Sequence, residues 1–334
     1  MPTFRALRVH ENQDGTFSRQ IEERQTQDLP EGEVLVRVHY AGLNYKDALS
    51  ATGNKGVTRR YPHTPGIDAA GVVAESQHED LAEGDEVIVT SYDLGMNTDG
   101  GFAEYIRVPA DWIVPKPKAL SLKQSMILGT AGFTAGLGLY KMLQNGQAPE
   151  QGKILVTGAT GGVGSMAVGI LAKAGFEVIA STGKASAHDY LTALGASEIV
   201  SREAVQEDSK RPLLKPRWAG AIDTVGGNTL ETVLKACKRH GSVAACGLVL
   251  SPKLNTSVFP FILNGINLLG IDSERCTMPV RRDIWDRLAS DWRIPMLDEA
   301  GSLITLDELD EQIDRILKGK VRGRIVVEHE AAKS

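Results

Sequence analysis

The sequence is poor in cysteine. Its 334 residues include only three cysteines, Cys237, Cys246 and Cys276, an odd number without the close spacing of metal ligands. This pattern excludes a disulfide scaffold and a four-cysteine zinc site. Because free thiols are typical of a reducing compartment, we expect a cytoplasmic protein.

A surplus of basic residues and a long apolar segment are also missing. Lysine and arginine total 37 against 42 aspartates and glutamates, so the net charge is −5, and a broad basic surface for nucleic acid is not expected. The longest uncharged run, residues 124–140, has 17 residues, fewer than the roughly 20 of a membrane span, and predicts a buried helix. The first residues lack the apolar run of a signal peptide. We therefore expect neither nucleic acid nor a membrane as partner.

Aromatic residues are scarce at 5%, whereas glycine is abundant at 35 residues. With 14 prolines the chain still stays below the ~25–30% glycine plus proline of low-complexity sequences. The glycines are therefore expected at turns and at places where the backbone approaches another group closely. A length of 334 residues predicts about two domains.

The first third of the chain is predicted to be β-rich. Residues 33–40 alternate apolar and polar side chains, as a half-buried strand does. Short strands of this kind, separated by turn signals, indicate a small antiparallel or barrel-like domain. The further strands are expected at residues 67–74, 85–90, 102–108 and 112–115.

From about residue 125 the pattern changes to strands that alternate with helices, which predicts a parallel, doubly wound sheet. The last sixty residues, with two helices and a strand, are expected to return to the first domain. The predicted domains are therefore 1–125 with 272–334, and 126–271. The elements expected are strands at 153–157, 177–181, 197–200, 220–225, 241–247, 266–271 and 324–328, and helices at 162–174, 185–194, 228–237, 281–290 and 307–317.

The strongest motif is the glycine-rich stretch at residues 156–164, VTGATGGVG, which follows an apolar strand and opens a helix. Glycine here permits a tight turn and close approach of the backbone to a pyrophosphate, and the helix N-terminus offers N–H groups to the phosphates. A glycine turn with a purely structural role is the alternative. The expected cofactor contacts are Thr160, Gly161, Gly162, Val163 and Gly164.

The end of the second strand of this unit indicates which dinucleotide binds. An NAD site usually carries an acidic residue there for the ribose hydroxyl, whereas this chain has Ser181, Thr182, Gly183 and Lys184, with Arg202 after the third strand. Hydroxyls and cations suit a 2′-phosphate, so we predict NADPH rather than NADH. The alternative is that both cations are ordinary surface residues.

Seven short motifs extend this pattern over the whole chain: LNYKD at 43–47, PGIDAAG at 65–71, GTAGFTA at 129–135, IDTVG at 222–226, ACG at 245–247, FPFIL at 259–263 and RRDIWDRL at 281–288. With them the chain resembles the medium-chain dehydrogenase/reductase superfamily. Within it, the chain is similar to the zinc-free quinone oxidoreductase branch of YhdH/YhfP type, which includes acrylyl-CoA reductase (NADPH). The resemblance implies an α/β protein with a GroES-like β-rich catalytic domain and a Rossmann domain. It also implies a homodimer, formed by edge pairing near residues 266–271.

The zinc enzymes of this superfamily have cysteine where this chain has Asn44, and His-Glu where it has Ile67 and Asp68. No cysteine cluster occurs near residues 90–115, and His63 is a lone histidine, so no metal site is expected. Without a Lewis acid the chemistry shifts from alcohols to a carbon–carbon double bond conjugated to a carbonyl. The function predicted is NADPH-dependent reduction of an activated alkene, foremost acrylyl-CoA to propanoyl-CoA, by hydride transfer to the β-carbon and protonation at the α-carbon. The alternatives are an NADPH:quinone reductase and a catalytically idle dinucleotide- or RNA-binding protein of the crystallin type.

The resemblance also suggests roles for individual residues. Tyr45 is expected to contact the nicotinamide and to donate a proton, with a packing role as the alternative, and Asn44 is expected to orient the substrate carbonyl. Thr130, Leu248, Ile271 and Arg324 are further candidates for cofactor contact. For the phosphates of coenzyme A the candidates are Arg281, Arg282 and Lys320, with a solvated helix face as the alternative for the two arginines.

Overall fold

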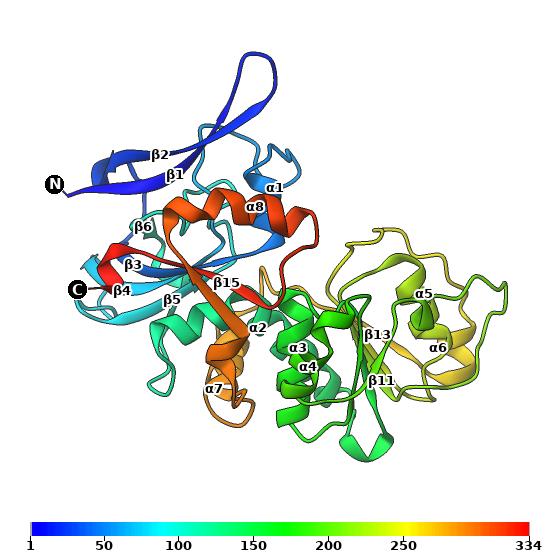
Figure 1. Ribbon diagram of the computed structural model, residues 1–334. Helices are drawn as coiled ribbons and strands as arrows, with labels where there is room; N and C mark the ends of the chain where they lie inside the picture. The colour runs from blue at the N-terminus through cyan, green and yellow to red at the C-terminus, as the bar shows by residue number, and fades with distance from the viewer. Residues whose placement is uncertain (1, 334) are drawn as a thin grey trace. The chain divides into compact units, whose positions relative to one another are not determined.

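The protein is described here by a computed structural model, which covers residues 2–333 (Figure 1). The chain divides into two compact units. Unit 1 comprises Met1–Thr130, Glu274–Trp285 and Leu297–Ser334, and unit 2 comprises Ala131–Ser273 and Asp286–Met296. This division differs from the predicted one in three places: the first boundary falls after residue 130, residues 272–273 belong to unit 2, and residues 286–296 also belong to unit 2.

Unit 1 is built on a seven-stranded sheet in the order β14-β15-β3-β4-β5-β7, with β6 also paired to β3. The strand predicted from alternation at residues 33–40 is the centre of this sheet, and Val34, Val36 and Val38 lie in its buried core. The strands are β3 (Val34–Leu43), β4 (Asp68–Ser76), β5 (Glu86–Thr90), β6 (Tyr105–Val108), β7 (Ile113–Pro115), β14 (Gly301–Ile304) and β15 (Arg324–Glu328).

An N-terminal hairpin of β1 (Thr3–Glu11) and β2 (Phe17–Gln25) was not expected from the sequence. Most of β2 is polar and partly exposed, so it lacks the apolar alternation that marks a half-buried strand. In β1, Leu7 and Val9 are buried in a core cluster that also includes residues of α1 (Tyr45–Ser50) and α8 (Leu309–Leu317). These two short helices pack against each other.

Unit 2 contains a six-stranded parallel sheet in the order β10-β9-β8-β11-β12-β13. The strand order reverses between β8 and β11, and the crevice at such a reversal is where doubly wound folds bind ligands. The predicted α/β fold class, a GroES-like unit and a Rossmann unit, is confirmed. The strands are β8 (Ile154–Val156), β9 (Val178–Ser181), β10 (Ala196–Val200), β11 (Gly220–Asp223), β12 (Ser242–Ala245) and β13 (Asn267–Gly270), and the helices are α3 (Gly162–Lys173), α4 (His188–Ala193), α5 (Gly227–Lys235) and α6 (Phe259–Asn264).

The uncharged run at residues 124–140 lies in α2 (Leu122–Gln144), which is interrupted by non-helical backbone at Gly129 (φ 49°, ψ −154°). This helix is long and apolar enough to cross a membrane, yet 78% of its most apolar window is buried inside the protein, as in a core helix. The remaining helix is α7 (Met278–Ala289), and the 3₁₀ turns are η1 (Thr26–Asp28), η2 (Ala110–Trp112), η3 (Pro149–Gln151), η4 (Ala185–Ala187), η5 (Glu203–Val205), η6 (Leu297–Ala300), η7 (Leu306–Glu308) and η8 (Glu330–Ala332).

Candidate active site

The glycine-rich loop of unit 2 connects β8 to α3. Gly158 has a φ of 58°, and a Cβ atom there would lie 2.3 Å from Thr224 Oγ1. A Cβ atom on Gly164 would lie 2.3 Å from the carbonyl oxygen of Gly158, so the first turn of α3 packs directly on the loop. Gly161 is the N-cap residue and provides no capping side chain. The N–H groups of the first helical turn therefore have no side-chain acceptor at the cap, as an anion site at a helix N-terminus requires.

The loop is held by a residue that sequence reasoning left without a role. Asp223, at the end of β11, accepts a hydrogen bond from Thr157 Oγ1 at 2.7 Å and one from the Gly226 backbone at 2.8 Å. Its side chain is fully buried, and burial raises the pKa of this carboxyl. Asp223 thus ties the carboxyl ends of β8 and β11 together beside the expected crevice. The only signal in the sequence was its place in the IDTVG motif.

The predicted 2′-phosphate residues lie together after β9. Ser181 and Thr182 are buried, and the Arg202 guanidinium lies over Gly183, where a Cβ atom would be 3.3 Å from one of its nitrogens. Burial, together with the positive charge of Arg202, lowers the pKa of Lys184. Within residues 2–333 the Arg202 guanidinium has no hydrogen bond or ion pair. Two neighbouring cations, one of them without an ion pair in the described part of the chain, suit a doubly charged phosphate.

The other predicted contacts of unit 2 follow neighbouring strands at the same edge of the sheet. Leu248 comes after β12 and is 63% exposed. Ile271 comes after β13 and donates its backbone N–H to the Ala245 carbonyl at 3.1 Å. Because the carboxyl ends of parallel strands meet at one edge, both residues lie on the same side of the sheet as the glycine loop.

In unit 1, the Asn44 amide is fully engaged by the protein. Its Nδ2 donates to the Gly42 carbonyl at 3.2 Å and to Asp68 Oδ2 at 2.8 Å, and its Oδ1 accepts from Arg324 at 3.0 Å. Both amide hydrogens are therefore used. The orientation of the substrate carbonyl by Asn44 stays a prediction, and these protein contacts lead us to propose a positioning role for its amide.

Asp68 is the centre of this cluster, although its place in the sequence indicated only that a zinc site is lacking. The carboxylate is fully buried and forms an ion pair with Arg324 at 3.3 Å. It also accepts hydrogen bonds from the Thr130 backbone N–H at 2.9 Å and from the Thr130 hydroxyl at 2.5 Å. Asp68 thus joins two predicted site residues, Asn44 and Thr130.

Arg324 is the buried basic residue of this cluster. Its side chain is 3% exposed, and its guanidinium donates to the Ile127 and Leu43 carbonyls at 3.1 Å and 3.0 Å. A Cβ atom on Gly42 or Gly129 would lie within 3 Å of that guanidinium, so the two glycines make room for it. The structure thus gives Arg324 buried protein partners where we expected the cofactor, and we propose that it supports Asn44.

Asp47 supports the same loop from the other side. It accepts the backbone N–H groups of Asn44 at 2.7 Å and Ile67 at 2.8 Å, and it is fully buried. Burial and the charge of Asp68 raise the pKa of Asp47 to about 7. Asp47 thereby fixes the first turn of α1 to the start of β4.

Tyr45 is the first residue of α1, and its side chain is 44% exposed. Its hydroxyl has no hydrogen-bond partner within residues 2–333. An exposed, unpaired phenol next to a rigid cluster is available to a substrate.

Arg281 was one of the cations expected to bind the phosphates of coenzyme A, and its position does not suit that role. Its side chain is fully buried, where it donates to Thr90 and lies over the Tyr92 ring at 4.5 Å. It stabilises the core of unit 1 and is not accessible to a phosphate. Arg282 and Lys320 are exposed.

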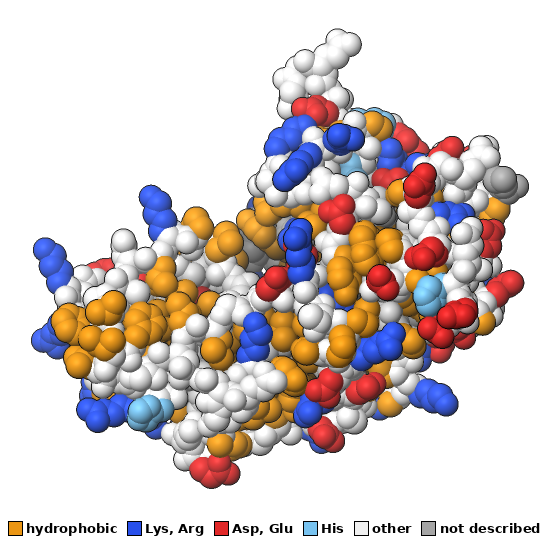
Figure 2. Space-filling model, turned by 180° about the vertical axis from the view of Figure 1, so that it is seen from behind, with side chains coloured by type: hydrophobic (Ala, Val, Ile, Leu, Met, Phe, Trp, Pro, Cys, Tyr) orange, Lys and Arg blue, Asp and Glu red, His pale blue; other side chains and the backbone are white. Residues whose placement is uncertain are grey.

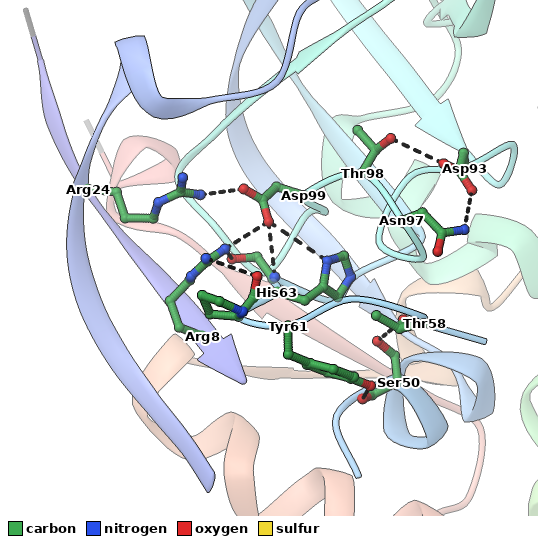
Figure 3. A network of polar contacts seen from close by, with 12 residues as sticks. Arg8, Arg24, Ser50, Thr58, Tyr61, His63, Asp93, Asn97, Thr98 and Asp99 are labelled. Carbon is green, nitrogen blue, oxygen red and sulfur yellow. Dashed lines mark hydrogen bonds and ion pairs between the residues drawn. The ribbon is translucent and has the colours of Figure 1, made fainter. Parts of the chain in front are cut away.

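The lone His63 belongs to a structural network around Asp99 (Figure 3). Asp99 forms ion pairs with Arg8 at 2.8 Å and with Arg24, and it lies 3.8 Å from His63 Nδ1. Burial lowers the pKa of His63. Within residues 2–333 there is no group of three or more His, Cys, Asp or Glu side chains that could hold a metal ion. The absence of a metal in the working protein stays a prediction.

Comparison with known proteins identifies the family. The family described as alcohol dehydrogenase GroES-like domain matches residues 30–118, and zinc-binding dehydrogenase matches residues 162–290. YhfP of Bacillus subtilis, which bears the name of a quinone oxidoreductase, is 47% identical over 97% of this chain and 98% of its own length. The chain belongs to the medium-chain dehydrogenase/reductase superfamily. The predicted resemblance to its zinc-free quinone oxidoreductase and acrylyl-CoA reductase members is confirmed.

The similarity of this medium-chain dehydrogenase/reductase to further relatives also covers nearly the whole chain. Acrylyl-CoA reductase AcuI of Ruegeria pomeroyi is 44% identical over 97% of this chain and 99% of its own. The yhdH oxidoreductase of Salmonella enterica, solved in complex with NADP, has a TM-score of 0.94 at 43% identity and covers 98% of this chain and 100% of its own. The crystal structure of YhfP with NAD bound has a TM-score of 0.96 at 46% identity, with the same coverage.

Proposed function

We propose that this protein is a zinc-independent, NADPH-dependent reductase of activated carbon–carbon double bonds, with acrylyl-CoA as substrate and propanoyl-CoA as product. The observation that carries the proposal is the 44% identity to acrylyl-CoA reductase AcuI over 97% of the chain. Proteins related at this level share the fold and the family. The reaction itself depends on the residues of the site, so these must support it as well.

The donor groups of unit 2 fit NADPH. The loop and the N-terminus of α3 supply backbone N–H groups for the pyrophosphate at Thr160, Gly162, Val163 and Gly164, whereas the Gly161 N–H already donates to the Gly158 carbonyl at 3.0 Å. Ser181, Thr182, Gly183, Lys184 and Arg202 supply hydroxyls, an N–H group and two cations for the 2′-phosphate. When bound, NADPH supplies the hydride that reduces the β-carbon. The relative crystallised with NAD makes the choice between the two dinucleotides worth testing directly.

Residues of the chain must then donate the proton to the substrate and keep the proton donor in position. We infer that Tyr45 presents its unpaired hydroxyl to the substrate and donates the proton that reaches the α-carbon, because it is an exposed and unpaired phenol beside the cluster. Asp47, Asp68 and Arg324 hold the loop before α1 so that Tyr45 keeps one position. Such preorganisation lowers the barrier by avoiding reorganisation during the reaction.

The second candidate function is an NADPH:quinone reductase, favoured by the name that YhfP bears at 47% identity. Steady-state assays with NADPH and acrylyl-CoA, beside a panel of benzoquinones, separate the two. We expect the larger kcat/KM for acrylyl-CoA and stoichiometric formation of propanoyl-CoA. A larger kcat/KM for a quinone would overturn this choice, and the absence of turnover with every acceptor would favour an idle dinucleotide-binding protein.

We also propose that the protein is a homodimer formed through unit 2. β13 is an edge strand of the six-stranded sheet, and exposed apolar side chains lie beside it on α6 and the preceding loop. Figure 2 shows apolar side chains gathered at this end of unit 2. An unpaired strand with an apolar flank is a liability unless another chain covers it. The exposed residues are Val258, Phe259, Ile262, Leu263 and Leu268.

Light scattering during size-exclusion chromatography tests the dimer. We expect twice the mass of a 36.0 kDa chain, and a monomer for Ile262→Glu, which places a charge on a side chain that is 69% exposed. Leu303→Glu, at a 46% exposed leucine of unit 1, is the control and leaves the mass unchanged. A native monomer would contradict the proposal.

The three free cysteines agree with the cytoplasmic location that we propose, since such thiols persist in a reducing compartment.

A further inference from the structure

Unit 2 has a cavity at the edge of its sheet that lies opposite the expected cofactor crevice. The volume of the cavity is about 520 Å³, which is within the range of small-molecule sites. Four charged residues that line it shortly precede the parallel strands β8, β9, β11 and β12, and they are Lys153, Glu177, Arg217 and Lys238. The cavity is therefore at the amino ends of the strands, whereas doubly wound folds bind the dinucleotide at the carboxyl ends.

Backbone hydrogen bonds join the three segments that carry the cations of this cavity. The Ala219 N–H donates to the Lys153 carbonyl at 2.8 Å. The Lys238 N–H donates to the Trp218 carbonyl, also at 2.8 Å. Since Trp218 and Ala219 directly follow Arg217, the segments before β8, β11 and β12 are fixed to one another, and each of them contributes one cation to the cavity.

Two of these cations, Arg217 and Lys238, form no ion pair in the part of the chain that the structure describes. The Arg217 guanidinium lies over the Trp218 ring at 4.8 Å and donates one N–H group to the Ala204 carbonyl. A Cβ atom on Gly152 would lie 2.8 Å from Lys238 Nζ, so this glycine leaves room for the ammonium group. Two unpaired cations in one cavity suit a phosphate with two negative charges, and a guanidinium can bind two of its oxygens.

The other charged groups of the cavity are carboxylates. Glu198 forms an ion pair with Lys153 at 2.9 Å, and Glu177 lies 4.0 Å from the same ammonium group. An ionised carboxylate only accepts hydrogen bonds. It therefore repels a second anionic group of a ligand and binds a hydroxyl group. The cavity thus combines cations for one phosphate with acceptors for hydroxyl groups.

We propose that this cavity binds a phosphomonoester whose remaining part is neutral and carries hydroxyl groups, as in a sugar phosphate. Arg217 and Lys238 bind the phosphate, and Glu177 accepts hydrogen bonds from the hydroxyl groups. Because the cavity lies at the amino ends of the strands, such a ligand and a dinucleotide can occupy unit 2 at the same time. The proposal does not depend on the reductase function.

Titration calorimetry with glucose 6-phosphate tests the proposal on the full-length protein at low ionic strength, since salt screens exposed charges. The protein is saturated with NADP+, which occupies the phosphate-binding groups of the expected dinucleotide site. We expect glucose 6-phosphate to bind, inorganic phosphate to bind more weakly because it lacks the sugar hydroxyls, and glucose not to bind at millimolar concentration. In Arg217→Gln and in Lys238→Gln the affinity for glucose 6-phosphate falls about tenfold or more, as the loss of one charge-assisted hydrogen bond predicts.

Lys215→Gln and Arg239→Gln are the matched controls. Each removes an exposed cation close in sequence to Arg217 or Lys238 but outside the lining of the cavity, so the native affinity is retained. Glu177→Gln reports on the carboxylate wall. Because it removes a negative charge, we expect it to strengthen the binding of pyrophosphate and to narrow the preference for glucose 6-phosphate over inorganic phosphate.

Arg202→Ala separates this cavity from the expected 2′-phosphate site and is also informative if NADP+ does not bind. We expect this variant to bind glucose 6-phosphate with the native affinity. The inference would be overturned if glucose 6-phosphate does not bind, or if the two control variants lose as much affinity as Arg217→Gln and Lys238→Gln. Displacement of glucose 6-phosphate by NADP+, or its loss in Arg202→Ala, would place the phosphate in the dinucleotide site and would overturn the inference while leaving the proposed function intact.

Discussion

The Asn44 amide donates a hydrogen bond to the Asp68 carboxylate at 2.8 Å, and Arg324 contacts both residues, at 3.0 Å from Asn44 and 3.3 Å from Asp68. In the zinc enzymes of the superfamily these two positions carry a cysteine and a glutamate. Here an amide, a carboxylate and a guanidinium satisfy one another in a buried cluster. Buried charges are stable only when paired in this way, and removing one partner leaves the other uncompensated.

Asp68→Asn is therefore expected to destabilise unit 1 strongly. The variant leaves the 3% exposed Arg324 side chain without its carboxylate, and breaking such a buried pair costs about 3–5 kcal/mol. Chemical denaturation followed by circular dichroism measures the loss. Asp307→Asn is the control, because Asp307 pairs with Arg5 at the surface with its side chain 62% exposed. Exposed pairs contribute under about 1 kcal/mol, and a similar loss in both variants would refute the assignment.

Arg202→Ala is expected to reduce the preference for NADPH. A charge-assisted hydrogen bond contributes about 1.5–3 kcal/mol, so kcat/KM with NADPH falls roughly 10- to 100-fold, while kcat/KM with NADH changes little. Steady-state kinetics with the two cofactors gives the ratio. Arg217→Ala, a cation of the same unit that lies over the Trp218 ring, serves as control. Equal losses with NADPH and NADH would show that Arg202 does not contact the 2′-phosphate.

Tyr45→Phe is expected to lower kcat while the affinity for NADPH stays near the native value. The hydroxyl has no partner within residues 2–333, so its removal costs little stability, whereas general-acid catalysis contributes 10²–10⁴-fold. Single-turnover measurements with acrylyl-CoA test the chemical step, and dissociation constants for NADPH test binding. Full turnover in Tyr45→Phe would exclude the proton-donor role and leave a packing role.

Because of His329, the free energy of unfolding of unit 1 is expected to decrease at acid pH. Burial lowers the pKa of this imidazole to about 4, below the value of about 6.5 in an unfolded chain. Between these values the unfolded state binds a proton that the folded state does not, so the free energy of unfolding decreases as pH falls from about 6.5 to 4. The full loss amounts to roughly 3 kcal/mol. His39, whose pKa burial also lowers, adds to the same trend.

Denaturation at several pH values measures this dependence. His329→Gln removes the titrating group, so the slope of unfolding free energy against pH becomes shallower below pH 6.5. His188→Gln, at an exposed histidine of unit 2, keeps the native slope. An unchanged slope in His329→Gln would contradict the assignment, whatever the absolute stability of that variant.

Local pattern in the sequence was sufficient for most of the fold. The alternation at residues 33–40 and the buried strand before the glycine loop predicted β3 and β8, because side-chain periodicity reports which face is buried. The glycine run at 156–164 predicted the turn and the start of α3 for a different reason. Glycine permits the positive φ of residue 158, and at residue 164 a Cβ atom would clash with the loop. Polar β2 escaped prediction because it lacks this periodicity.

The tertiary structure alone decided the roles of the charged residues. Arg281 was expected at the phosphates of coenzyme A and Arg324 at the cofactor, yet both are buried against carbonyl groups or a carboxylate from distant segments. Asp68 and Asp223 gained their roles in the same way, from partners far along the chain. Whether a charge is paired or solvated depends on residues 62 to 256 positions away, and no local pattern records that separation. The sequence by itself determined the fold and where the cofactor loop lies, and the packed structure decided which side chains remain available to a ligand.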